Sequence, residues 1–133
     1  MRVFEIDGRT LSSLEDFAAR VSGEVLAGHR WQGNLDALND CLRGGFGTPD
    51  EGFVLRIKNS ADLQLALGHA ETVRWFEACV RTCHPSNRQH VLERLDAARR
   101  AEGPTLFDML VAIIRDHGPG GTEAEDNVVL ELV

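Results

Sequence analysis

The chain has 133 residues, with 14 lysines and arginines against 21 aspartates and glutamates, and a formal net charge of −7. This length suits one domain with a hydrophobic core, and the acidic balance argues against nucleic-acid binding and favours a basic partner. The longest uninterrupted apolar run, Met109 to Ile114, is too short to span a bilayer. The N-terminus lacks the pattern of a secretory signal, so we expect a cytoplasmic protein without a nucleic-acid or membrane partner.

The first third of the chain predicts a strand followed by two helices. Residues 3–6 form the strand, which the turn dipeptide Asp7-Gly8 ends. The run Ser12-Ser13-Leu14-Glu15 has the form of a capping box, and apolar residues at helical spacing follow it until Gly23. After a loop over 26–33, residues 34–43 predict a short amphipathic helix with Asn34 as its N-cap.

The helix over 34–43 carries two carboxylates on one face. Its leucines share one stripe, whereas Asp36 and Asp40 lie opposite them, one helical turn apart. Like charges at this spacing repel by roughly 0.2–0.5 kcal/mol, so a use in presenting negative charge to a basic partner is indicated. Their separation of about 6 Å resembles that of adjacent phosphates on a nucleic-acid strand. An ordinary solvated helix face is the alternative.

The rest of the chain predicts two more strands with several helices between them. The strands cover residues 53–57 and 128–133, and residues 117–126 are expected to form a flexible acidic loop. The helical stretches begin at Asn59-Ser60, continue to a stop at Pro85, resume from Ser86 to Gly103, and end with a helix opened by Pro104-Thr105. Because strands separated by helices favour parallel pairing, we expect an α/β fold with a three-stranded parallel sheet packed with helices, in the order β-α-α-β-α(several)-β.

The three cysteines do not make a disulfide framework. Cys41 lies near the apolar stripe of its helix and is expected in the core. Cys79, Cys83 and His84 could supply metal ligands, but their spacing matches no usual zinc pattern. We therefore expect ordinary packing of these side chains, with no metal and no cofactor.

One motif resembles a known family. The segment "GNLDALNDCL" over 33–42, preceded by Trp31 and followed by "RGGFG", resembles the barstar family of intracellular inhibitors of secreted bacterial ribonucleases. The resemblance covers residues 1–58 well and about 103–133 more weakly. It implies a single barstar-like domain over 1–133, with an atypical helical insertion at about 60–102.

The resemblance also implies a partner-binding surface. Asp40 matches the central acidic residue of the family and Asp36 its companion, while Trp31 aligns with one of two loop aromatics that contact the ribonuclease. Arg30 replaces the other aromatic, Asn39 replaces a tryptophan of the motif helix, and Asp116 matches a further carboxylate late in the last long helix. Two alternatives stay open: Trp31 as a core anchor of its loop, and Asp116 beside His117 as a helix-end pair without a partner. The predicted partner-binding residues are Arg30, Trp31, Asp36, Asn39, Asp40 and Asp116.

The function implied by the resemblance is inhibition of a secreted barnase-type, guanyl-specific ribonuclease, whose basic active site the carboxylates of the 34–43 helix would block. A barstar-like interaction or immunity module against a different toxin or regulatory partner is the alternative. An enzyme that holds Mg²⁺ between Asp36 and Asp40, or that uses a histidine as general base, is disfavoured because no nucleophile signature or phosphate loop is present. The protein is expected to be no enzyme and to be a monomer when free.

Overall fold

Three parallel strands form the sheet on which the other elements are placed. The computed structural model describes residues 1–133. The strands β1 (Val3–Asp7), β2 (Phe53–Lys58) and β3 (Val128–Leu132) lie side by side in the order β1-β2-β3. Both pairings are parallel, with Leu55 of β2 opposite Phe4 on one side and Leu130 on the other. The predicted three-stranded parallel sheet is confirmed.

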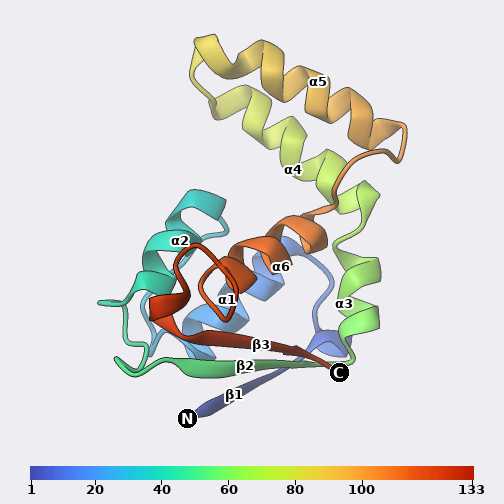
Figure 1. Cartoon of the computed structure of the whole chain (residues 1–133). Coiled ribbons are helices and arrows are strands. Elements are labelled where there is room, and N and C mark those ends of the chain that lie inside the picture. Colours follow the sequence, from blue (N-terminus) through green and yellow to red (C-terminus); the bar gives the residue numbers. More distant parts are fainter.

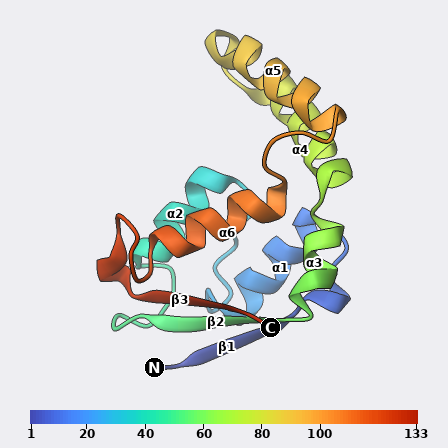
Figure 2. The ribbon, with the colours of Figure 1, turned by 45° about the vertical axis from the view of Figure 1, so that its right-hand side comes forward.

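The two faces of the sheet differ in chemistry. The face toward the helices is buried and includes Phe4, Ile6, Phe53, Leu55, Ile57 and Val128. On the other face Arg56 lies between two glutamates of the neighbouring strands, with Nε 2.8 Å from Glu131 and Nη1 3.6 Å from Glu5. In Figures 1 and 2 all the helices lie on one side of the sheet. A purely parallel sheet usually has both faces covered, and here a row of ion pairs crosses the uncovered face.

Three helices lie over the buried face of the sheet: α1 (Leu14–Glu24), α2 (Leu35–Arg43) and α6 (Leu106–Asp116). The short α3 (Ser60–Ala66) follows β2 at its carboxyl end, and three 3₁₀ turns cover Gly8–Thr10, Pro85–Asn87 and Ala124–Asp126. The main core cluster joins buried residues of the sheet, α1, α2, α3 and α6. The element order agrees with the predicted one. None of the helices has the length and apolar character needed to cross a bilayer.

Helix α1 begins one residue later than its capping signal predicts. The Ser13 hydroxyl accepts a hydrogen bond from the backbone N–H of Asp16 at 3.1 Å, and the Asp16 carboxylate accepts from the N–H and hydroxyl of Ser12 at 3.0 and 2.8 Å. The predicted box of Ser12 with Glu15 is therefore wrong: Ser13 is the N-cap, and Glu15 takes no part in the cap. Asp16, the third helical residue, reaches back to Ser12, one residue before the N-cap, so the two carboxylate contacts steady the turn that leads into α1.

Helices α4 (His69–Thr82) and α5 (Arg88–Arg99) form an antiparallel hairpin that stands away from the sheet, and we call residues 69–99 the arm. The arm has a small core of its own, made of Phe76, Leu95 and Ala98. Pro85 follows α4 as predicted, whereas α5 begins at Arg88 and not at Ser86, because the 3₁₀ turn comes first.

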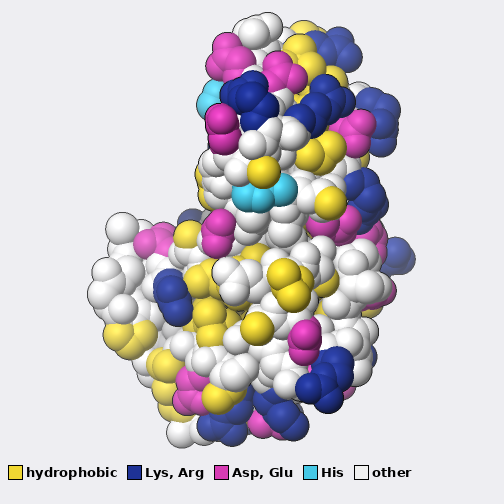
Figure 3. Space-filling model, turned by 90° about the vertical axis from the view of Figure 1, so that its right-hand side faces the viewer, with side chains coloured by type: hydrophobic (Ala, Val, Ile, Leu, Met, Phe, Trp, Pro, Cys, Tyr) yellow, Lys and Arg dark blue, Asp and Glu magenta, His cyan; other side chains and the backbone are white.

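The first turn of α4 fixes the arm to the body. The Glu71 carboxylate accepts from the backbone N–H of Leu14 at 2.7 Å, and Arg74 binds both Glu71 and Glu15. The Thr72 hydroxyl accepts from the N–H of Leu106 at 2.8 Å. These hydrogen bonds anchor the arm to the N-terminal ends of α1 and α6. In the side view of Figure 3, the arm projects above the rest of the molecule.

Candidate functional site

Helix α2 presents its polar face to solvent because its other face is buried. The Asn34 side chain accepts from the backbone N–H of Ala37 at 3.0 Å, which confirms the predicted N-cap. Leu38, Cys41 and Leu42 are buried in the main core. The predicted core position of Cys41 is confirmed, and burial raises the pKa of its thiol.

The two carboxylates of α2 lie on this exposed face. The Asp40 side chain is 64% exposed, and its Oδ1 accepts a hydrogen bond from Nη1 of Arg43 at 2.8 Å. Asp36 is exposed, in the first helical turn, and forms no ion pair within the chain. A carboxylate at this position interacts favourably with the helix dipole. The face thus offers one free carboxylate and one that is half engaged.

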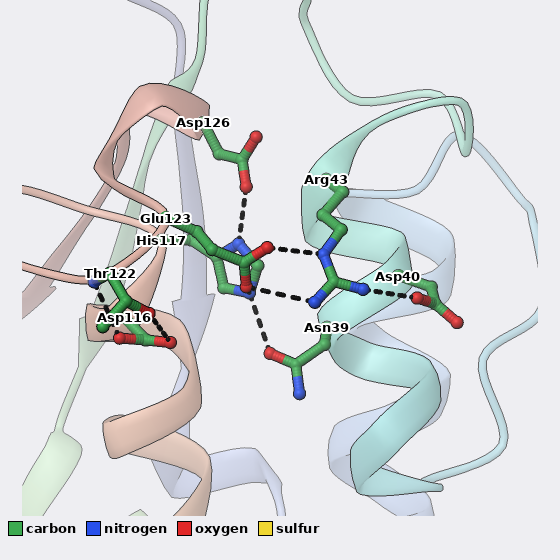
Figure 4. Close-up of polar contacts among 8 residues, drawn as sticks. All are labelled: Asn39, Asp40, Arg43, Asp116, His117, Thr122, Glu123 and Asp126. Atoms are coloured by element: carbon green, nitrogen blue, oxygen red, sulfur yellow. Dashed lines mark hydrogen bonds and ion pairs between the residues drawn. The ribbon is translucent and has the colours of Figure 1, made fainter.

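Arg43 joins α2 to the loop between α6 and β3, residues 117–127, which we call the C-terminal loop. Its Nε lies 2.6 Å from Oε1 of Glu123 and its Nη2 lies 3.2 Å from Oε2, so the guanidinium holds this carboxylate through two bonds (Figure 4). The hydrogen bond from Arg43 lowers the pKa of Glu123 below its ordinary value. Glu123 is therefore ionised beside the acidic face of α2.

His117 lies beneath this ion pair and is fully buried. Its Nδ1 is 2.7 Å from Oδ2 of Asp126, and its Nε2 is 2.9 Å from the Asn39 side-chain amide (Figure 4). The partner atom of Nε2 is the amide oxygen Oδ1 of Asn39, which accepts a hydrogen bond from the ring. Asn39 consequently points into the fold toward the C-terminal loop.

An open hollow of about 440 Å³ lies beside Asp40. It is lined by residues of the loop before α2, of α2 itself and of the turn after it: Arg30, Trp31, Gln32, Asn34, Ala37, Asp40, Cys41 and Phe46. The Phe46 ring contacts His29 edge-on, with ring centroids 6.1 Å apart. The acidic face of α2 therefore borders a recess with aromatic and polar walls, which a protruding side chain of a partner could enter.

Residues 1–97 match the family model described as barstar (barnase inhibitor). The chain belongs to the barstar family. The match covers α2 and the hollow beside it, and it continues through α4 into α5. Comparisons with curated proteins and with solved structures gave no match. Members of this family are inhibitors, which act by binding a partner, and the exposed carboxylates of α2 lie within the matched residues.

The barstar fold does not place all the predicted partner-binding residues alike. Asp36, Asp40 and Arg30 are exposed, and Arg30 and Asp40 line the same hollow. Trp31 is 3% exposed, and its indole N–H donates to the carbonyl of Asn34 at 2.7 Å. This burial agrees with the alternative in which Trp31 anchors its loop, while an edge of the residue still lines the hollow.

Asp116 is engaged within its own loop. Its carboxylate accepts from the backbone N–H of Thr122 at 3.0 Å and from the Thr122 hydroxyl at 2.8 Å, and these bonds lower its pKa. The predicted flexibility of residues 117–126 is wrong, because the two hydrogen bonds of Asp116 and the contacts of His117 and Glu123 order the loop. The sequence allows a helix-end pair of Asp116 with His117. In the structure the hydrogen-bonded partner of Asp116 is Thr122.

Sequence reasoning missed three residues of this site: Arg43, His117 and Glu123. The guanidinium and its carboxylate are separated by 80 positions, and the buried imidazole lies 78 positions from its amide partner. No local spacing marks such pairs. The sequence contains one indirect indication of these contacts. The predicted acidic loop and the predicted 34–43 helix both belong to segments that are expected to pack on the same sheet.

One group of possible metal ligands occurs here. The ligand atoms of His117, Glu123 and Asp126 lie within 4.8 Å of one another. The Arg43 guanidinium already neutralises Glu123, and Asp126 is bonded to the imidazole. A cation would have to displace the first and break the second, so we interpret the group as a hydrogen-bond network. Cys79, Cys83 and His84 do not converge, and the His84 ring turns to the Ser86 hydroxyl 2.7 Å away.

Proposed function

We propose that this barstar inhibits a basic, barnase-type ribonuclease of guanyl specificity by placing Asp36 and Asp40 of α2 in its active site. The observation that carries the proposal is the pair of exposed carboxylates one turn apart on α2, next to a recess of about 440 Å³. The proposed protein is a cytoplasmic monomer that protects the producing cell and has no catalytic activity of its own.

The physical basis is charge complementarity. A ribonuclease active site binds phosphates, so it gathers arginine, lysine and histidine around a concave surface. Carboxylates spaced like successive phosphates can take their places through charge-assisted hydrogen bonds. Losing one member of a desolvated charge pair costs about 2–5 kcal/mol, a range to which complexes of this family themselves contributed. Most of that cost arises because the partner charge is left buried and unpaired.

We also propose that residues 1–133 form one barstar-like domain in which residues 60–102 are a helical insertion. The separate core of the arm supports this, since Phe76, Leu95 and Ala98 are not part of the main cluster. The arm is anchored through Glu71 and Thr72, and Asp36 and Asp40 of α2 are exposed.

A second candidate function is binding of a different toxin or regulatory partner. Arg30 favours it, because this exposed cation lines the hollow beside Asp40 and would oppose a uniformly basic cleft. A partner with a carboxylate opposite Arg30 and a cation opposite Asp40 would fit both charges.

The test is a titration of the purified protein into an assay of barnase and related guanyl-specific ribonucleases. We expect stoichiometric inhibition by the wild type and a loss of at least about tenfold in affinity for Asp40→Asn, since each 1.4 kcal/mol is tenfold. Asp50→Asn is the matched control, because Asp50 is an exposed carboxylate in the turn before β2 and belongs neither to α2 nor to the lining of the hollow. Equal inhibition by Asp40→Asn and the wild type would contradict the role of α2. No inhibition of any of these ribonucleases would leave the second candidate.

A further inference from the structure

We propose that Arg43 and Glu123 act as a positioning pair that fixes the Asp40 carboxylate before the partner arrives. This inference rests on the proposed function, because it assigns to the pair a role in binding through Asp40. It concerns residues outside the predicted partner-binding set, and Glu123 also lies outside the part of the chain that matches the family.

The N–H donors of Arg43 bind two different carboxylates. Nε and Nη2 hold the Glu123 carboxylate at 2.6 and 3.2 Å, while Nη1 reaches Oδ1 of Asp40 at 2.8 Å. The guanidinium is planar and its donors have a fixed arrangement. Fixing two of them on Glu123 therefore fixes the direction of the third. In Figure 4 the second oxygen of Asp40 points away from Arg43 and carries no bond within the chain.

The charges explain why two residues are needed. Arg43 alone would orient Asp40 but would also neutralise it, and a neutralised carboxylate attracts a basic partner weakly. Glu123 offsets the charge of Arg43 and is itself ionised, as the lowered pKa of its carboxyl indicates. The pair thus adds no net charge, and Asp40 keeps its negative charge for the partner.

Hydrogen bonds hold the segment beneath the pair. The backbone N–H of Glu123 donates to the carbonyl of Asp116 at 2.9 Å, and the Asp116 carboxylate holds Thr122. Nε2 of the buried His117 lies 3.6 Å from the Glu123 carboxylate. Glu123 therefore does not lie on a free loop, and Arg43 is held from a fixed point.

Preorganisation predicts a specific kinetic effect. Ordering an exposed side chain on binding weakens a complex by about two- to tenfold, and a side chain that is already ordered avoids this loss. Most such differences appear in the dissociation rate. The opposite view treats Arg43 as a competitor of the partner for Asp40, so that removing Arg43 would tighten the complex.

The first experiment uses the free protein and needs no partner. Three-bond side-chain couplings measured by NMR report whether Asp40 occupies one χ1 rotamer. We expect one rotamer in the wild type and averaged couplings in Arg43→Met, with no change in Arg115→Met, whose arginine is exposed on α6 and forms no ion pair. Averaged couplings in the wild type, or unchanged couplings in Arg43→Met, would overturn the proposal.

The second experiment is a double-mutant cycle with barnase as the probe. Arg43→Met should speed dissociation about two- to tenfold in the wild-type background and leave it nearly unchanged in the Asp40→Ala background. A merely structural role of Arg43 in holding the loop would raise both rates equally, and tighter binding by Arg43→Met would establish the competitor. If the wild type does not bind barnase, the proposed function fails for this partner, while the NMR result still decides whether the pair fixes Asp40.

A third variant separates charge from orientation. Glu123→Gln keeps an oxygen for Arg43 but leaves the guanidinium charge without compensation. We expect slower association with barnase at low salt and a smaller difference at high salt, where exposed charges are screened. Equal association rates at low salt would show that Glu123 does not preserve the charge of Asp40.

Discussion

The Glu71 carboxylate on α4 accepts a hydrogen bond from the backbone N–H of Leu14, the first residue of α1, at 2.7 Å. The Glu71 side chain is only 10% exposed and is also bound by Arg74. The hydrogen bond from Arg74 and the one from Leu14 both lower the pKa of Glu71. One side chain therefore serves two elements, because it caps α1 from outside and holds the base of the arm.

Removing the Glu71 carboxylate should destabilise the whole fold. In Glu71→Ala the N–H of Leu14 and the guanidinium of Arg74 lose a partner, and we expect a loss of about 1–3 kcal/mol in the free energy of unfolding. Glu77→Ala is the matched control on the same helix, because its exposed ion pair with Arg99 is long, at 3.6 Å, and should contribute under about 1 kcal/mol. Urea unfolding measures both. A similar loss in the two variants would contradict the anchoring role of Glu71.

The stability of the protein should fall in acid. Glu71, Asp116 and Glu123 have pKa values lowered by hydrogen bonds in the folded state, so the unfolded state binds more protons in this range. Their contribution is complete above the unfolded values of about 4 and is lost as the pH falls through the folded values. In Asp116→Asn, which retains an acceptor for Thr122, unfolding free energies measured between about pH 6 and pH 3 should fall less steeply. A slope in Asp116→Asn equal to that of the wild type would contradict the contribution of the Asp116 carboxylate.

Association with the proposed ribonuclease partner should depend on salt. Exposed carboxylates steer a basic partner over a screening length of about 30 Å at 0.01 M salt but only about 8 Å at 0.15 M. Stopped-flow association rates with barnase should therefore fall as salt rises, and Asp36→Asn should weaken this dependence because it removes one steering charge. Rates that do not change with salt would exclude electrostatic capture by α2.

Truncation of the buried histidine should loosen the C-terminal loop. In His117→Ala a cavity replaces a fully buried ring, and Asp126 and Asn39 lose their partner, so we expect a loss of about 2–4 kcal/mol in unfolding free energy. His90→Ala changes an exposed histidine on the arm and should stay within about 0.5 kcal/mol of the wild type. Thermal unfolding of both variants provides the measurement. An unchanged melting temperature in His117→Ala would show that the network does not order the loop.

The sequence predicts those parts of the fold that depend on neighbours along the chain. Apolar periodicity and an N-cap suffice for α2, where Asn34 and the buried Leu38 act within one helix. Alternation and the order of elements suffice for the parallel sheet. The N-cap of α1 is Ser13 and not the predicted Ser12, because both serines have a side chain that can cap a helix.

The rest of the site depends on contacts between distant segments. The loop over 117–126 contains several glycines and acidic residues, a composition typical of mobile segments, yet it is ordered by partners that local patterns do not reveal. Asn39 is turned inward by a histidine that lies 78 positions later in the chain. Its role follows from tertiary packing, which decides whether a polar side chain of an amphipathic helix meets solvent or another element.

The small core of the arm has a consequence for how the protein opens under native conditions. Three buried residues hold α4 to α5, whereas 23 form the main cluster beneath α2 and the sheet. Local opening free energies follow such differences in buried contacts. Amide hydrogens in the outer turns of the arm should then exchange with deuterium long before those of β2, so that a protease could cleave the arm while α2 remains folded.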